Sequence, residues 1–145
     1  MNTDAQVQQY VYRFTAERGR PPASSHVASA LGIDQNEVLS AFRRINGRRL
    51  LVLARTGEIV MAPPFSAVPT PFRVEANSQA YFANCVWDSF GIAAALHSDA
   101  VIDSSCACCG EPMKLSIVAD RPVPEPGVAH FAVPAANWWD DITYT

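Results

Sequence analysis

The hydrophobic positions at the start of the chain recur with the period of a helix. Val7, Tyr10, Val11 and Phe14 are spaced 3, 4 and 7 residues from the first of them. This spacing places their side chains on one face of an amphipathic helix. Gly19 and the two prolines after it are typical of a helix end. The sequence therefore predicts a first helix that ends near Gly19.

Two further helices are expected in the next thirty residues. Ser24 or Ser25 is suited to cap a second helix, which ends at Gly32. Asp34 is suited to cap a third helix, with Glu37 at the third position, as in a capping box. The apolar residues of this third helix again follow a helical period.

Short apolar runs then replace the helical pattern. Residues 50–54 and 59–61 flank a turn that contains glycine, which predicts two short strands. Three helices and a hairpin in this order predict a winged-helix-like unit over residues 1–62. Residues 63–73 contain four prolines and are expected to form an extended strap.

The rest of the chain, residues 74–145, mixes strand and helix patterns. The expected elements are an apolar run at 80–87, a helix at 89–96, strands at 101–105, 113–118 and 128–133, and a Pro-rich loop at 119–127. The predicted fold class is α+β, with the N-terminal unit packed on a small mixed or antiparallel sheet.

Composition and charge limit the classes of function. Hydrophobic residues make up 49% of the 145 residues, and no apolar run reaches the roughly 18–20 residues that cross a bilayer. The N-terminus does not have the pattern of a secretory signal, and four cysteines in an unexported chain are expected to be thiols. These features predict a cytoplasmic protein.

The net charge of −3 divides unevenly along the chain. Residues 1–62 hold eight arginines and five acids, which gives +3, and residues 63–145 hold three bases and nine acids, which gives −6. If the first unit bound DNA, its third helix would enter the major groove, with Arg43 and Arg44 on phosphates. The alternative is a winged helix kept for packing, and we expect no DNA partner because +3 is a small charge for a DNA-binding unit.

Cys85 and Asp88 are the first candidate site. Residues three apart lie on one face of a helix, so a thiol that binds soft metals stands beside a carboxyl group that can donate a proton. The apolar residues around Asp88 favour its burial, which raises a carboxyl pKa. The same spacing also fits a buried cysteine beside an aspartate without chemistry.

Cys106, Cys108 and Cys109 form a second candidate site in a turn between two predicted strands. Three thiols within four residues suit Zn²⁺, Cu⁺ or Hg²⁺. The alternative is one structural cysteine and two exposed thiols. Trp138 and Trp139 can line an apolar pocket or cover the edge of the core.

These residues, in this order, resemble the organomercurial (alkylmercury) lyase family. The resemblance rests on Cys85-Val-Trp87-Asp88, on Cys106 leading to a Gly-Glu-Pro turn, and on the Trp-rich final segment. It implies protonolytic cleavage of a carbon–mercury bond to a hydrocarbon and Hg²⁺. It also implies an organomercurial substrate, no organic cofactor, release of Hg²⁺ to small thiols, and a mercuric-ion-accepting protein as a further partner.

The resemblance also implies roles for single residues. Cys85 matches the first catalytic cysteine, which holds mercury, and Asp88 matches the acid that protonates the leaving carbon. Cys106 matches a structural cysteine, and Trp87, Trp138 and Trp139 are expected around the pocket.

The family's second catalytic cysteine aligns immediately after Thr145, so we expect a truncated form or a substitute thiol. Cys108 and Cys109 are the candidate substitutes. Two other functions stay open: a non-catalytic thiol protein that binds Hg, Cu or Zn ions, and a winged-helix regulator.

Overall fold

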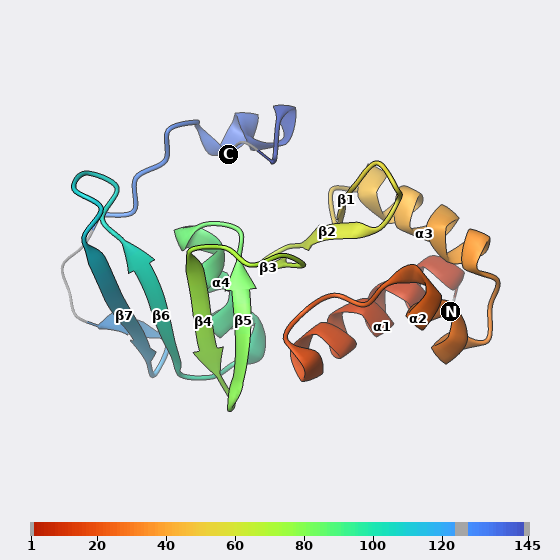
Figure 1. Ribbon diagram of the computed structural model, residues 1–145, viewed down its shortest axis with the longest axis horizontal. Helices are drawn as coiled ribbons and strands as arrows, with labels where there is room; N and C mark the ends of the chain where they lie inside the picture. The colour runs from red at the N-terminus through yellow and green to blue at the C-terminus, as the bar shows by residue number, and fades with distance from the viewer. Residues whose placement is uncertain (1, 124–127, 144–145) are drawn as a thin grey trace.

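The structure is a computed structural model that describes residues 2–123 and 128–143 (Figure 1). In this part of the chain, three helices precede an antiparallel sheet, and a fourth helix packs on that sheet. The helices are α1 (Thr3–Arg18), α2 (Ser24–Leu31), α3 (Gln35–Gly47) and α4 (Val86–Leu96), with a 3-10 helix η1 (Ala135–Asp140). The strands are β1 (Val52–Leu53), β2 (Ile59–Ala62), β3 (Phe65–Ser66), β4 (Phe72–Ala76), β5 (Gln79–Ala83), β6 (Ala100–Ser105), β7 (Pro112–Val118) and β8 (Arg121–Val123). The predicted α+β class, with N-terminal helices and an antiparallel sheet, is confirmed.

The predicted ends of the first three helices agree with the structure except at one cap. Gly19 ends α1 in the left-handed conformation, and the Asp34 carboxylate accepts a hydrogen bond from the N–H of Asn36 at the start of α3. The prediction that Ser24 or Ser25 caps α2 was wrong, because the N-cap is Ala23, with no side-chain bond.

Ser24 instead contacts the β1–β2 hairpin. Its N–H and its hydroxyl both donate to the carboxylate of Glu58, which lies just before β2. The N-terminus of α2 is therefore held by an acid from elsewhere in the chain, which also suits the helix dipole.

The strands pair in the order β1-β2-β3-β5-β4-β6-β7-β8. Within the predicted strap, Phe65 is buried and pairs with both Ala62 of β2 and Ala83 of β5. The strap contains the short strand β3, which joins the hairpin after the helices to the rest of the sheet. Figure 1 shows this narrow bridge between the helices and the broader part of the sheet.

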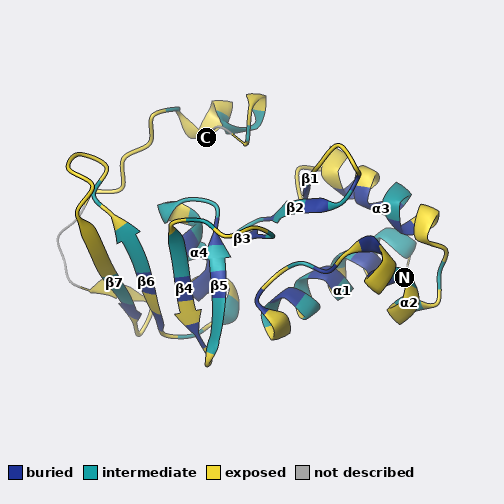
Figure 2. Cartoon of the chain, in the orientation of Figure 1, coloured by how far each residue is buried: buried dark blue, intermediate teal, exposed yellow. Residues whose placement is uncertain are grey.

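Two buried clusters stabilise the molecule, one on each side of this bridge (Figure 2). The first is formed by α1–α3 with the β1–β2 hairpin, and the second by α4 against β4, β5, β6 and β7. Tyr12 packs against both clusters. Tyr81 of β5 is fully buried, and its hydroxyl donates to the carbonyl of Ala16 in α1 over 2.6 Å. These tyrosines attach the helical part to the sheet.

The prediction of a strand at residues 128–133 was wrong. This segment pairs with no described strand, and Val128 is 93% exposed. The edge of β7 is instead taken by β8, whose residues fall in the predicted Pro-rich loop. The rest of that loop, residues 124–127, lies outside the described residues.

Arg44 is one of the two arginines considered for phosphate contact. It forms salt bridges with two acidic side chains. Its guanidinium lies 2.8 Å from both Asp4 and Glu37, which raises the pKa of Arg44. This pairing takes positive charge from the outer face of α3. No helix in the described part of the chain has the length and apolar character that a bilayer crossing requires.

Candidate functional site

Cys85 and Asp88 lie at the junction of β5 and α4. Strand β5 ends at Ala83, and Cys85, in an extended conformation, is the N-cap of α4. Asp88 is then the third residue of the first helical turn. The side chain of an N-cap residue faces the N–H groups of this turn. The structure thus brings together the two residues that the sequence predicted as a pair.

The Cys85 thiol is partly buried, and its environment favours the protonated form. Burial raises the pKa of Cys85 above its ordinary value, and the negative charge of Asp88 adds to this rise. The N–H groups of Asp88 and Trp87 face the sulfur and act in the opposite direction. A thiolate formed at Cys85 therefore meets two backbone donors.

Asp88 is also partly buried, and burial raises its pKa. The side-chain amide of Asn84 donates to its carboxylate over 2.9 Å and works against this rise. The same amide lies 3.4 Å from the carbonyl of Pro64, so the strap helps to orient it. Burial was predicted for Asp88, and it provides a carboxyl group that keeps its proton to a higher pH.

Asn84 was missed by the sequence analysis. Its amide oxygen is buried and has no hydrogen-bond partner among the described residues. Asn84 and Asp88 are four residues apart, which is a spacing at which side chains interact near a helix, so a signal was available.

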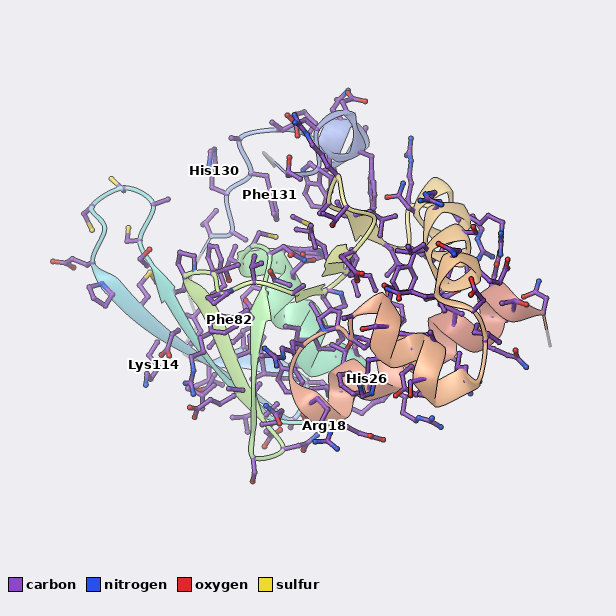
Figure 3. All side chains as sticks on the ribbon, turned by 45° about the vertical axis from the view of Figure 1, so that its right-hand side comes forward. Arg18, His26, Phe82, Lys114, His130 and Phe131 are labelled. Atoms are coloured by element: carbon purple, nitrogen blue, oxygen red, sulfur yellow. The ribbon has the colours of Figure 1, made fainter. Side chains whose placement is uncertain are left out.

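An aromatic cluster stands beside the first turn of α4. The ring of Phe131 contacts Trp87 edge-on, with centroids 6.1 Å apart, and contacts Trp138 at 5.1 Å. Trp138 is fixed on η1 by its indole N–H, which donates to the carbonyl of Val133. Figure 3 shows Phe131 pointing inward while His130 points away from the body.

This cluster contains two of the three tryptophans predicted around the pocket. Trp87 is 54% exposed even with Phe131 against it, so the cluster forms an open wall rather than a closed lid. Trp139 follows Trp138 on η1 and is partly exposed. Phe131 was missed, because it lay in a segment that was predicted to be a strand.

Cys106, Cys108 and Cys109 occupy the turn between β6 and β7. All four cysteines are free thiols; Cys108 and Cys109 are exposed, whereas Cys106 is partly covered. The pKa of Cys106 is lowered, because the N–H groups of Cys109 and Cys108 and the thiol of Cys109 donate to its sulfur. No described contact joins this turn to Cys85, so the substitution of Cys108 or Cys109 for the second catalytic cysteine stays a prediction.

The described residues contain no group of three His, Cys, Asp or Glu side chains close enough to hold one metal ion. A surface hollow of about 280 Å³ lies between α1 and α2, where it is lined by residues that include Arg13, Arg18 and His26. The residues that line this hollow come from α1 and α2, and none of them belongs to the site at Cys85 and Asp88.

Two comparisons with known proteins identify a family and a similar fold. Residues 65–145, more than half of the chain, match the sequence profile of the MerB family, described as alkylmercury lyase. The fold is similar to the crystal structure of the mercury-bound form of MerB2, with a TM-score of 0.65 and 23% sequence identity. That alignment covers 86% of this chain and 62% of the MerB2 chain, so this chain spans less than two thirds of the length of MerB2.

No curated protein matches the sequence. The matched profile covers the strap from Phe65 onward, the β5–α4 junction, the cysteine turn and the Trp-rich segment. On this evidence, the chain belongs to the alkylmercury lyase family.

Proposed function

We propose that this protein cleaves the carbon–mercury bond of organomercurials by protonolysis, with Cys85 as the mercury ligand and Asp88 as the acid. The observation that carries the proposal is a partly buried thiol at the N-cap of α4 beside a partly buried carboxyl group in the first turn of that helix. Mercury is a soft metal that prefers thiolate, and a carbon atom that loses mercury needs a proton.

The first step is a ligand exchange at mercury. The Cys85 thiol attacks an alkyl- or arylmercury thiolate, forms a sulfur–mercury bond, and its proton leaves with the displaced small thiol. The N–H groups of Trp87 and Asp88 face the sulfur, and they stabilise the charge that develops there. No electron transfer is involved.

The second step breaks the carbon–mercury bond. The electron pair of that bond stays with carbon and takes the proton of the Asp88 carboxyl group, which yields the hydrocarbon. The Asp88 carboxylate then balances the charge of the mercuric ion on Cys85. Two small thiols next remove the ion as a dithiolate and return protons to Cys85 and Asp88, so the cycle closes without an organic cofactor.

Three features of the structure support these roles. Partial burial of Asp88 raises its pKa, which favours the protonated acid before the reaction. The amide of Asn84, which donates to one carboxylate oxygen, restricts the direction of the carboxyl group. The wall of Trp87, Phe131 and Trp138 offers apolar surface for the organic group on mercury.

The test is hydrocarbon release from phenylmercury in the presence of excess small thiol. Wild type should release benzene, and Cys85→Ser should not. Cys108→Ser also removes one thiol, and it tests the predicted substitution. Benzene release at the wild-type rate excludes Cys108 as the second catalytic thiol, and loss of release assigns that role to Cys108. If wild type binds mercury but releases no benzene, the protein is a binding protein, which is the alternative function.

A further inference from the structure

The turn between β6 and β7 has a defined structure. Its two strands pair up to Ser105 and Pro112, at the base of the turn. The N–H of Cys106 donates to the carbonyl of Glu111 over 2.9 Å, and the N–H of Gly110 donates to the carbonyl of Cys106 over 2.8 Å. Gly110 has a φ of +76°, which few residues other than glycine adopt. The chain therefore closes tightly around Cys106.

This closure brings two sulfur atoms together. The N–H groups of Cys109 and Cys108 donate to the sulfur of Cys106, and so does the thiol of Cys109. The Cys109 sulfur is thus within hydrogen-bonding reach of the Cys106 sulfur, at the exposed end of the hairpin. Figure 3 shows the sulfur atoms of this hairpin tip standing clear of the body of the protein.

We propose that Cys106 and Cys109 form a second mercury site, a two-thiolate site for Hg²⁺ that is separate from Cys85 and Asp88. The pair of ligands follows from the geometry of the turn, and the choice of mercury rests on the proposed function. Binding forms two sulfur–mercury bonds and releases two protons, with no change of oxidation state. The site can hold the ion that the reaction at Cys85 produces.

The number of ligands favours a soft two-coordinate ion. A structural Zn²⁺ site needs four ligands, and no group of even three is found among the described residues. Hg²⁺ is stable with two thiolates in a line, and thiolates select soft ions. The two backbone donors on Cys106 stabilise its thiolate before the metal arrives.

Cys108 provides an internal control. It lies between the two proposed ligands in the sequence and is exposed, as Cys109 is, but its contribution to Cys106 is through its backbone N–H. Replacing its side chain therefore removes a second exposed thiol and leaves the pair in place.

The experiment adds mercuric chloride to the Cys85→Ser variant in the presence of excess monothiol. Retained mercury is read by native mass spectrometry and by the ultraviolet absorption of the mercury–thiolate bonds. A chelating pair gains effective concentration over single thiols. We expect one mercury per chain in Cys85→Ser and no change on adding Cys108→Ser. Adding Cys109→Ser or Cys106→Ser should weaken retention by about 10²–10⁴-fold.

Two results would overturn the proposal: no retained mercury in Cys85→Ser, or an equal loss on adding Cys108→Ser. Because Cys109 is exposed, its serine variant tests the pair even where Cys106→Ser does not fold, and thermal melting checks each variant. The readout is binding in a background without Cys85. A failure of hydrocarbon release by wild type therefore contradicts the proposed function without affecting this result.

Discussion

Gly19 ends α1 where that helix meets the first residues of β5, and Gly19→Ala tests how the helices are held on the sheet. Gly19 has a φ of +81°. A Cβ atom there would lie 2.3 Å from the carbonyl oxygen of Ala80 and 2.5 Å from the side-chain nitrogen of Gln79. The first neighbour is backbone, so it cannot move aside cheaply. Gly32, with a φ of +67° and no atom within 4 Å of such a Cβ, is the matched control.

Both substitutions lower the free energy of unfolding through backbone strain, but only Gly19→Ala adds a steric clash. A left-handed residue with a Cβ atom costs about 1–2 kcal/mol in either position. Overpacking against the sheet adds about 1–3 kcal/mol at Gly19 alone. Gly32→Ala should therefore lower the free energy of unfolding by about 1–2 kcal/mol, and Gly19→Ala by about 2–5 kcal/mol.

Urea unfolding followed by circular dichroism measures both values. For a chain of this size each kcal/mol corresponds to about 2–4 °C in melting temperature, so the difference is also visible in a thermal melt. Equal losses in the two variants would refute the close contact between the end of α1 and the sheet.

Three further predictions concern two residues of the site and the attachment of α1 to the sheet. Burial raises the pKa of Asp88, so the folded state holds its proton more tightly than the unfolded state does. Wild-type stability should then fall as the pH rises from the ordinary aspartate pKa through the raised one. Asp88→Asn should remove this fall, and denaturant titrations at several pH values check it; an unchanged slope would contradict it. Asn84→Ala removes the hydrogen bond that lowers the pKa of Asp88, so that pKa should rise further. A pH titration followed by carbon NMR of the Asp88 carboxyl group measures this pKa. A lower Asp88 pKa in Asn84→Ala than in wild type would contradict the hydrogen bond. Tyr81→Phe removes the bond to Ala16 and should cost about 1 kcal/mol of unfolding free energy, as measured in urea. No loss would mean that this bond does not stabilise the attachment of α1.

The helices and the β6–β7 hairpin were predictable because their signals are local. A helical period, an aspartate cap and a glycine end specify α3 without knowledge of the rest of the chain. The prediction of a strand at 128–133 was wrong because strand formation does not depend on local sequence alone. A strand needs a partner, and whether β7 pairs with that segment or with β8 depends on distant residues.

The site was predictable only in part. The Cys-x-x-Asp spacing was enough to place Cys85 and Asp88 together, although the boundary between β5 and α4 fell inside a continuous apolar run that has no clear period. Phe131, which follows β8 in the sequence, contacts Trp87, and the carbonyl of Pro64 in the strap contacts the amide of Asn84. These contacts are tertiary, so no local pattern could indicate them.

The roles of Cys85 and Asp88 are tested by the fate of phenylmercury on Asp88→Asn, followed by intact-protein mass spectrometry and benzene release. This variant keeps the Cys85 thiol but lacks the acidic proton. A phenylmercury adduct should accumulate on Cys85, and benzene release should fall by about 10²–10⁴-fold relative to wild type. Benzene release at the wild-type rate, or a peptide map in which Cys85 carries no phenylmercury, would contradict these roles.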